Sequence, residues 1–202
     1  MRTAGIVGGM RYKMREILIS IRPKWCEKIC HVIGKDEMGK PIYEKRIEVR
    51  KSAPKEVPFK AYIYVTKYGI NGRSSEVLLF NKRIKEVYCG VYRNACYYSK
   101  DNFEICNGHI IGEFICDKVY SIKNQRNRFV VANDEQGVTN EIARQSCLDY
   151  YDMVNYLGNK DGYGWHIADL KIYGKPKELS EFCGRKKLTR PPQSWQFVEE
   201  KR

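Results

Sequence analysis

The segment that decides the fold is Ile42–Thr66, IYEKRIEVRKSAPKEVPFKAYIYVT. The run IEVR within it alternates apolar and charged side chains, which is typical of a half-buried strand. In such a strand Ile47 and Val49 face the core. Glu48 and Arg50 then share the other face, about 7 Å apart.

Four charged side chains lie close together in this segment, namely Lys45, Glu48, Arg50 and Lys51. One interpretation is a solvated strand face, stabilised by ion pairs across the sheet. The other is a surface that binds an anionic ligand through its cations. The spacing alone does not decide between these two interpretations, so the evidence has to come from the rest of the chain.

The charge of the whole chain favours an anionic partner. The 202 residues are enough for one domain with a substantial core. They carry 37 Lys and Arg against 24 Asp and Glu, a net charge of +13, which favours nucleic acid as the partner. The excess is uneven, since residues 22–60 hold 11 basic and 6 acidic side chains but residues 132–162 hold 2 and 6. One part of the surface is therefore suited to phosphates and another is not.

The eight cysteines are expected to be reduced thiols. The first 16 residues hold several basic residues and no long apolar segment, so we expect no secretory signal. No window approaches the roughly 20 apolar residues of a membrane span. These features predict a cytoplasmic protein without membrane contact, in which thiols stay reduced. The cysteine spacing is too loose for a typical zinc site, and we expect no metal and no cofactor.

The remaining pattern predicts an α+β fold. Strands are expected at 16–22, 61–66, 109–120, within 162–173 and at 195–198, and a loop at 121–133. Helices are expected at 23–32 and 139–157, the second with an interruption at 147–149. Trp25, Ile29 and Val32 should pack inward from the first helix. Gly112 marks a bulge or a close backbone approach in its strand, aiming Glu113 into a cleft.

These elements amount to a small mixed β-barrel of five to six strands with peripheral short helices. Residues 1–15 are interpreted as an N-terminal extension and 16–200 as a single domain. A Tyr- and Cys-rich insertion is expected at about 69–107.

The order of several short motifs resembles the ASCH family of the PUA-like superfamily, in its phage or prophage type. The motifs are ILISIRPKWCEKI, K-x-x-E-x-R-K, AYIYVTK, IIGEFICDKV, GYGWHI and PPQSW. Together they cover roughly 17–199. The family pattern G-x-K-x-x-E-x-R falls on Lys45, Glu48 and Arg50, with Tyr43 in place of the glycine.

The resemblance implies a cleft, lined by this trio, that binds RNA or a nucleotide. Arg supplies a planar donor fork, Lys a mobile cation, and Glu an acceptor for an amine. Aromatic side chains beside the cleft would stack on a base. The expected nucleic-acid-binding residues are Lys24, Trp25, Lys45, Glu48, Arg50, Lys51, Tyr163 and Trp195.

Two other functions remain open. Some proteins resembling this family are amidohydrolases that act on modified cytidine, and nuclease activity is proposed for related domains. Glu48 stands where the amidohydrolases have Thr, so an enzyme here would use Lys45, Glu48 and Glu113 as catalytic groups. The third function is a protein-interaction module, with the insertion at 69–107 as its surface and zinc as an optional stabiliser.

Overall fold

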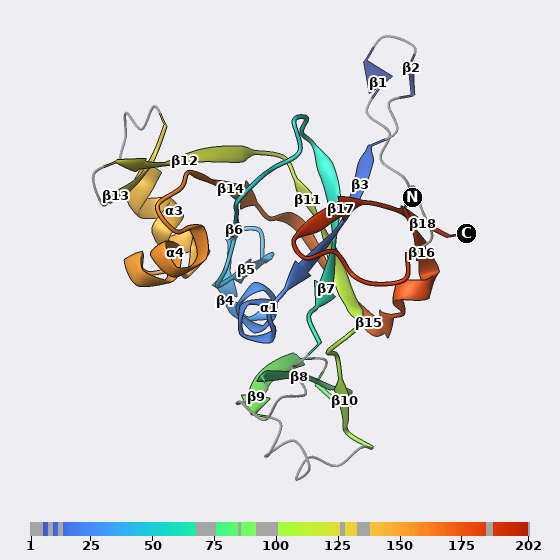
Figure 1. The fold of residues 1–202 in the computed structure, drawn as a ribbon. Coiled ribbons are helices and arrows are strands. Elements are labelled where there is room, and N and C mark those ends of the chain that lie inside the picture. The colour runs from blue at the N-terminus through green and yellow to red at the C-terminus, as the bar shows by residue number, and fades with distance from the viewer. Residues whose placement is uncertain are drawn as a thin grey trace.

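The structure is a computed structural model that describes residues 6–7, 10–11, 14–67, 76–84, 86–91, 101–125, 128–132, 138–184 and 188–201. Over these residues the fold is mixed α+β, mostly strands with three short α-helices (Figure 1). The helices are α1 (Pro23–Cys30), α3 (Val138–Ser146) and α4 (Tyr150–Leu157), with a 3₁₀ turn η1 (Leu179–Glu181). None of the described helices is long and apolar enough to cross a membrane.

The largest sheet has five strands in the order β15-β11-β7-β3-β17. Its members are β15 (Ala168–Lys177), β11 (Ile110–Cys116), β7 (Phe59–Val65), β3 (Arg15–Ile21) and β17 (Trp195–Phe197). The central pair β3 and β7 is parallel, and the other pairs are antiparallel. The strands predicted for these segments are therefore confirmed.

A second sheet of four antiparallel strands holds the segment from which the prediction started. Its order is β13-β12-β14-β6, with β13 (Arg128–Val131), β12 (Val119–Gln125), β14 (Gly162–His166) and β6 (Ile47–Arg50). Among the described residues the strands form separate sheets, and no closed barrel is found. Of the predicted mixed β-barrel with peripheral helices, the structure shows a mixed α+β fold, mostly strands with three short helices. The predicted loop at 121–133 is wrong, because β12 and β13 form a hairpin there.

The central strands are buried on both faces, which explains their continuous apolar sequence. Ile17, Ile19 and Ile21 of β3 pack in one core cluster with α1 and Trp165. Leu18, between them, points to the other face and packs in a second cluster with Tyr62 of β7. Both faces of this sheet are therefore covered by other parts of the chain.

The helices lie in the predicted segments, although α1 ends at Cys30, two residues before the predicted end. Pro23 occupies the first turn of α1, and Cys26 and Ile29 are buried beneath it. The predicted break in 139–157 is confirmed at Cys147, whose φ of 55° separates α3 from α4. Asp149 then caps α4 by accepting from the N–H of Asp152.

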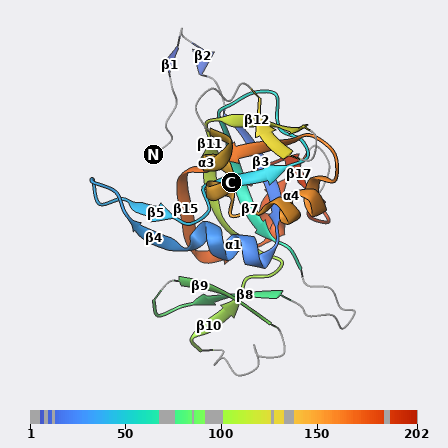
Figure 2. The ribbon, with the colours of Figure 1, turned by 90° about the vertical axis from the view of Figure 1, so that its left-hand side faces the viewer.

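Within the predicted insertion, three strands form a sheet of their own in the order β10-β8-β9. They are β8 (Glu76–Asn81), β9 (Glu86–Val91) and β10 (Phe103–Ile105). This sheet lies beneath α1 in both views (Figures 1 and 2). The N–H of Cys89 donates to Glu27 of α1 at 2.8 Å, which ties the sheet to the helix. Residues 92–100, in the Tyr- and Cys-rich run, lie outside the described residues.

The remaining strands form two-stranded sheets. They pair β4 (Val32–Lys35) with β5 (Pro41–Tyr43), β1 (Ile6–Val7) with β2 (Met10–Arg11), and β16 (Phe182–Cys183) with β18 (Glu199–Glu200). The β4–β5 hairpin projects from the body of the protein (Figure 2). Val32 is 45% exposed on it, so its predicted inward packing is wrong because the helix ends before it.

Gly112 lies at a register shift in β11, as its position in the strand predicts. A Cβ there would come within 2.5 Å of the Lys171 carbonyl oxygen of β15. Backbone cannot yield as a side chain does, so we expect Gly112→Ala to lower the free energy of unfolding by about 2 kcal/mol. Urea unfolding measures it.

The matched control is Gly174→Ala in β15, where a Cβ would meet nothing within 4 Å. It should leave the urea midpoint nearly unchanged. Equal midpoints for the two variants would show that the close approach at Gly112 does not exist.

Candidate functional site

The strand β6 is buried on both faces, rather than on one as predicted. Ile47 and Val49 pack into a cluster with α3 and α4, as core residues. Glu48 and Arg50 point the other way, toward β3 and α1, and are only 6% and 5% exposed. The alternation predicted from sequence is therefore confirmed, but the charged face looks inward.

Glu48 pairs with both Lys45 and Arg50, and the three side chains form one cluster, hereafter the Lys45–Glu48–Arg50 cluster. Its Oε1 lies 2.9 Å from Arg50 Nη2, and its Oε2 lies 3.4 Å from Lys45 Nζ. Arg50 Nη2 also donates to the Ser20 carbonyl oxygen of β3 at 2.8 Å. The guanidinium thus connects the four-stranded sheet to the five-stranded sheet.

Lys45 is the most buried of the three, at 1% exposure. Its ammonium donates to the Ser146 carbonyl oxygen at the end of α3, and lies 5.2 Å from the ring centre of Trp25. Burial lowers the pKa of Lys45, and the Glu48 carboxylate partly opposes this shift.

Two further lysines, Lys24 and Lys51, lie beside α4. Lys24 Nζ lies 4.3 Å from the ring centre of Trp25 and 4.0 Å from Asp152. Lys51 Nζ lies 5.5 Å from the ring centre of Tyr156. Asp152 and Tyr156 are one turn apart on α4, so both lysines lie along the same side of this helix.

Aromatic side chains surround the cluster on its inner side. Tyr163 of β14 is the register partner of Arg50, and Trp165 is that of Glu48. Trp195 packs edge-to-face on Trp165 at 5.9 Å and donates to Ser52 at 3.1 Å. Trp25, Tyr163 and Trp195 are partly buried and pack on the same core cluster.

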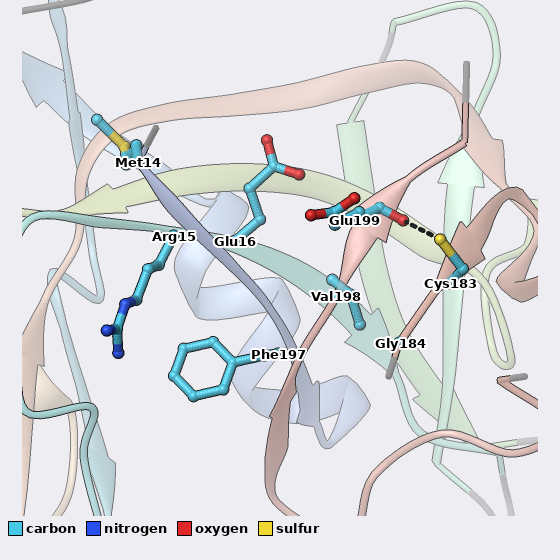
Figure 3. Close-up of a pocket in the computed structure, with 8 residues that line it drawn as sticks. All are labelled: Met14, Arg15, Glu16, Cys183, Gly184, Phe197, Val198 and Glu199. Carbon is cyan, nitrogen blue, oxygen red and sulfur yellow. Dashed lines mark hydrogen bonds between the residues drawn. The ribbon is translucent and has the colours of Figure 1, made fainter. Parts of the chain in front are cut away.

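The structure therefore brings seven of the eight predicted nucleic-acid-binding residues into one region. Lys51 is apart from them, because its contact Tyr156 packs with Ile47 and Val49 on the opposite face of β6. The structure does not place the charged trio on an open surface. Two described cavities lie elsewhere. One, of about 460 Å³, lies at the start of β3, where Glu16, Phe197 and Glu199 are among its lining (Figure 3). The other, of about 160 Å³, lies between β13 and the helices α3 and α4.

Glu113 does not join the Lys45–Glu48–Arg50 cluster. It accepts a hydrogen bond from the Tyr173 hydroxyl at 2.6 Å and lies 3.7 Å from Lys60. Its neighbour Phe114 points to the core cluster that contains Trp165, so Glu113 faces the opposite side of the sheet. Glu113 thus lacks the contact with Lys45 that the sequence-based enzyme hypothesis requires.

The described cysteines are free thiols. Burial raises the pKa of Cys106 and of Cys116 to about 12, so both are protonated at neutral pH. Within the described ranges, no group of three His, Cys, Asp or Glu side chains is arranged to hold a metal ion. Cys96, one of the loosely spaced cysteines, lies outside those ranges.

Sequence reasoning missed three parts of the site. Trp165 was within reach, because it is two residues from Tyr163 and so lies on the same face of a strand. The carbonyl groups of Ser20 and Ser146 carry no comparable signal. They are backbone acceptors 30 and 101 residues away from their partners.

Comparison with known proteins shows which solved structures have a similar fold. No protein-family model and no curated protein matches the chain. The crystal structure of ASCH from Zymomonas mobilis matches 92% of this chain and 88% of its own, with 13% identity and a TM-score of 0.50. A serine-to-alanine mutant of that protein matches 92% and 89%, with 14% identity and a TM-score of 0.50. The fold is ASCH-like.

This likeness agrees with the resemblance to the ASCH family in the sequence. At such identity it shows the fold alone, since one fold hosts many functions. The phage or prophage type and the single domain at 16–200 stay predictions.

Because the Glu48 carboxylate pairs with two buried cations, neutralising it should lower the free energy of unfolding strongly. Glu48→Gln keeps the shape of the side chain but leaves two buried cations without a counter-charge. Breaking a buried ion pair in this way costs about 3 kcal/mol, and we expect urea unfolding to show a loss of that size.

Asp161→Asn is the control, because Asp161 pairs with Lys123 on the exposed surface at 2.7 Å. Solvent screens such pairs, so the midpoint should shift far less. Equally small shifts in both variants would mean that solvent reaches the Lys45–Glu48–Arg50 cluster freely.

The lowered pKa of Lys45 predicts a pH dependence of stability. In the unfolded chain its amine keeps the ordinary pKa of 10.5. Between the folded and unfolded pKa values the unfolded chain binds the extra proton, so this group makes stability rise with pH. Wild type should therefore gain stability relative to Lys45→Met as the pH is raised from neutral toward 10.5.

Urea unfolding of both proteins over this pH range measures the difference. Wild type has to be compared with Lys45→Met because burial also raises the pKa of several thiols. These thiols lower the stability of both proteins alike at high pH. If the difference in free energy of unfolding between wild type and Lys45→Met stays constant or falls as the pH rises, burial does not destabilise the Lys45 ammonium.

Proposed function

We propose that this protein binds RNA or a nucleotide through the region around the Lys45–Glu48–Arg50 cluster. The observation that carries the proposal is that seven of the eight predicted residues, all but Lys51, lie close together. The buried charged cluster is bordered by Lys24 and by three partly buried aromatic side chains. Cations for phosphates and rings for bases are the two components of single-stranded nucleic-acid sites.

The charge of the chain supports a polyanionic partner. The formal net charge is +13, and Lys24 and Lys51 lie along α4, where a phosphate meets them without entering the core. Lys51 is exposed and Lys24 is partly exposed. The predicted cytoplasmic location and phage type fit such a role but do not support it independently.

A second candidate function is hydrolysis of modified cytidine or RNA in the same region. It is favoured by one observation, the buried Lys45 with its lowered pKa beside Glu48. An amine with a lowered pKa is a better base and nucleophile at neutral pH. If the protein turns over acylated cytidine or short RNAs and Lys45→Met does not, the protein is an enzyme. If it binds them without turnover, it is a binding protein.

Binding of a labelled single-stranded RNA tests the proposal by fluorescence anisotropy. Affinity should fall steeply from about 50 to about 200 mM salt, because the lysines release counterions from the phosphates. The double variant Lys24→Ala, Lys51→Ala should bind several-fold more weakly and show a shallower salt dependence.

The control is Lys175→Ala, which removes one positive charge from an exposed position on β15. This strand is at the edge of the sheet opposite β17. No RNA binding by wild type, or an equal loss in the Lys175 variant, would contradict the proposed site.

A further inference from the structure

The smaller cavity, between β13 and the helices α3 and α4, is lined mainly by apolar side chains. Buried Ile122 of β12, Ile142 of α3 and Met153 of α4 are among them. Its volume of about 160 Å³ is well below the roughly 300–1,000 Å³ of small-molecule pockets, so it has room for one side chain rather than a nucleotide. Ile122 and Ile142 pack in one core cluster with Ile47, so the cavity lies on the opposite face of β6 from Glu48.

Aromatic rings continue from this cavity onto the surface. Phe129 and Tyr150 both line it, with ring centres 6.1 Å apart. The ring of Tyr151 follows, 5.8 Å from that of Tyr150. Tyr150 is 44% exposed and Tyr151 is 74% exposed. The cavity therefore opens to solvent beside two exposed tyrosines, and tyrosine is enriched where proteins bind one another.

The part of the chain that forms the cavity is acidic, unlike the chain as a whole. Residues 132–162, which include both helices, hold 6 acidic and 2 basic side chains, whereas the whole chain has a net charge of +13. Glu141 and Arg144 of α3 pair with each other at 2.5 Å. Asp149, at the start of α4, is exposed and lines the cavity itself. Such a surface repels phosphates and attracts cations.

An apolar cavity with an acidic, aromatic rim matches one kind of partner. We infer that the cavity docks a basic segment of another protein. One large apolar side chain of the segment fills the cavity, and a neighbouring Lys or Arg lies against Tyr150 and Asp149. The ring face attracts a cation, and the carboxylate pairs with it. This surface is separate from the region proposed for RNA, so each can exist without the other.

Methionine methyl groups give a local probe of docking, because Met153 lines this cavity. Met14 lines the larger cavity and Met38 is 80% exposed in the turn between β4 and β5, so both serve as controls. The full chain is labelled with ¹³C at its methionine methyl groups, and the Met153 signal is assigned from its loss in Met153→Leu. Short synthetic peptides are added, with Ala, Leu, Phe or Trp at the centre and Lys, Ser or Glu at the flanks.

At least one Lys-flanked peptide with an apolar centre should shift the Met153 signal saturably and leave Met14 and Met38 unchanged. Its Ala-centred analogue should bind about tenfold more weakly, since the burial of one large side chain is lost. Its Glu-flanked analogue should give no shift. No shift with any Lys-flanked peptide, equal binding of Lys and Glu flanks, or a shift of Met14 or Met38 in place of Met153 would overturn the inference.

Variants then locate the docked segment. Ala143→Leu puts a larger side chain into the lining of the cavity, on α3 where Leu favours the helix, and should abolish the Met153 shift. Asp149→Asn keeps a residue that caps α4 but removes the charge, and should weaken binding several-fold. Asp161→Asn removes a charge from the exposed pair with Lys123 and should bind as wild type does. Circular dichroism establishes that each is folded, and unchanged binding in folded Ala143→Leu and Asp149→Asn would refute the proposed site.

Two other occupants are tested in parallel. Sedimentation velocity compares wild type with Ala143→Leu, and a dimer that only wild type forms would mean that a second copy fills the cavity, contrary to the inference. Single-stranded RNA that shifts Met153 would contradict it as well. RNA binding that leaves Met153 unshifted and is equal in Ala143→Leu would support two separate surfaces.

Discussion

The ion pair between Glu48 and Arg50 is the contact on which the arrangement of the site depends. It lies between the two main sheets, and the Arg50 guanidinium spans them by donating to the Ser20 carbonyl oxygen of β3. Lys45 extends the same network to the end of α3. A buried charge is tolerated only when it is paired and hydrogen-bonded, so these elements must keep their positions relative to one another.

This constraint gives the cluster two roles that are hard to separate by inspection. Its ion pairs and hydrogen bonds hold β3, β6 and α3 together, and it lies at the centre of the proposed binding region. Burial makes both roles sensitive to any change of charge. Lys24 and Lys51 are free of this limitation, because they are exposed to solvent at least in part.

The sequence predicts the members of the cluster but not its burial. Alternation in IEVR places Glu48 and Arg50 on one face, and the structure confirms it. What lies against that face depends on Ser20 and on Ser146, which are distant in sequence and contribute only backbone carbonyls. The position of Glu113 could not be predicted for a similar reason. Both faces of its strand are covered, and the alternation of side chains does not tell which face belongs to the site. The hairpin at 119–131 was missed because its polar sequence also suits a loop.

The most direct test of the account is the ¹H–¹⁵N signal of the Arg50 Nε–H group, assigned by comparison with Arg50→Lys. In the free protein burial should make it slow to exchange with solvent, and saturating RNA should shift it. Binding of RNA without any change in this signal would contradict the claim that RNA binds in the region around the Lys45–Glu48–Arg50 cluster.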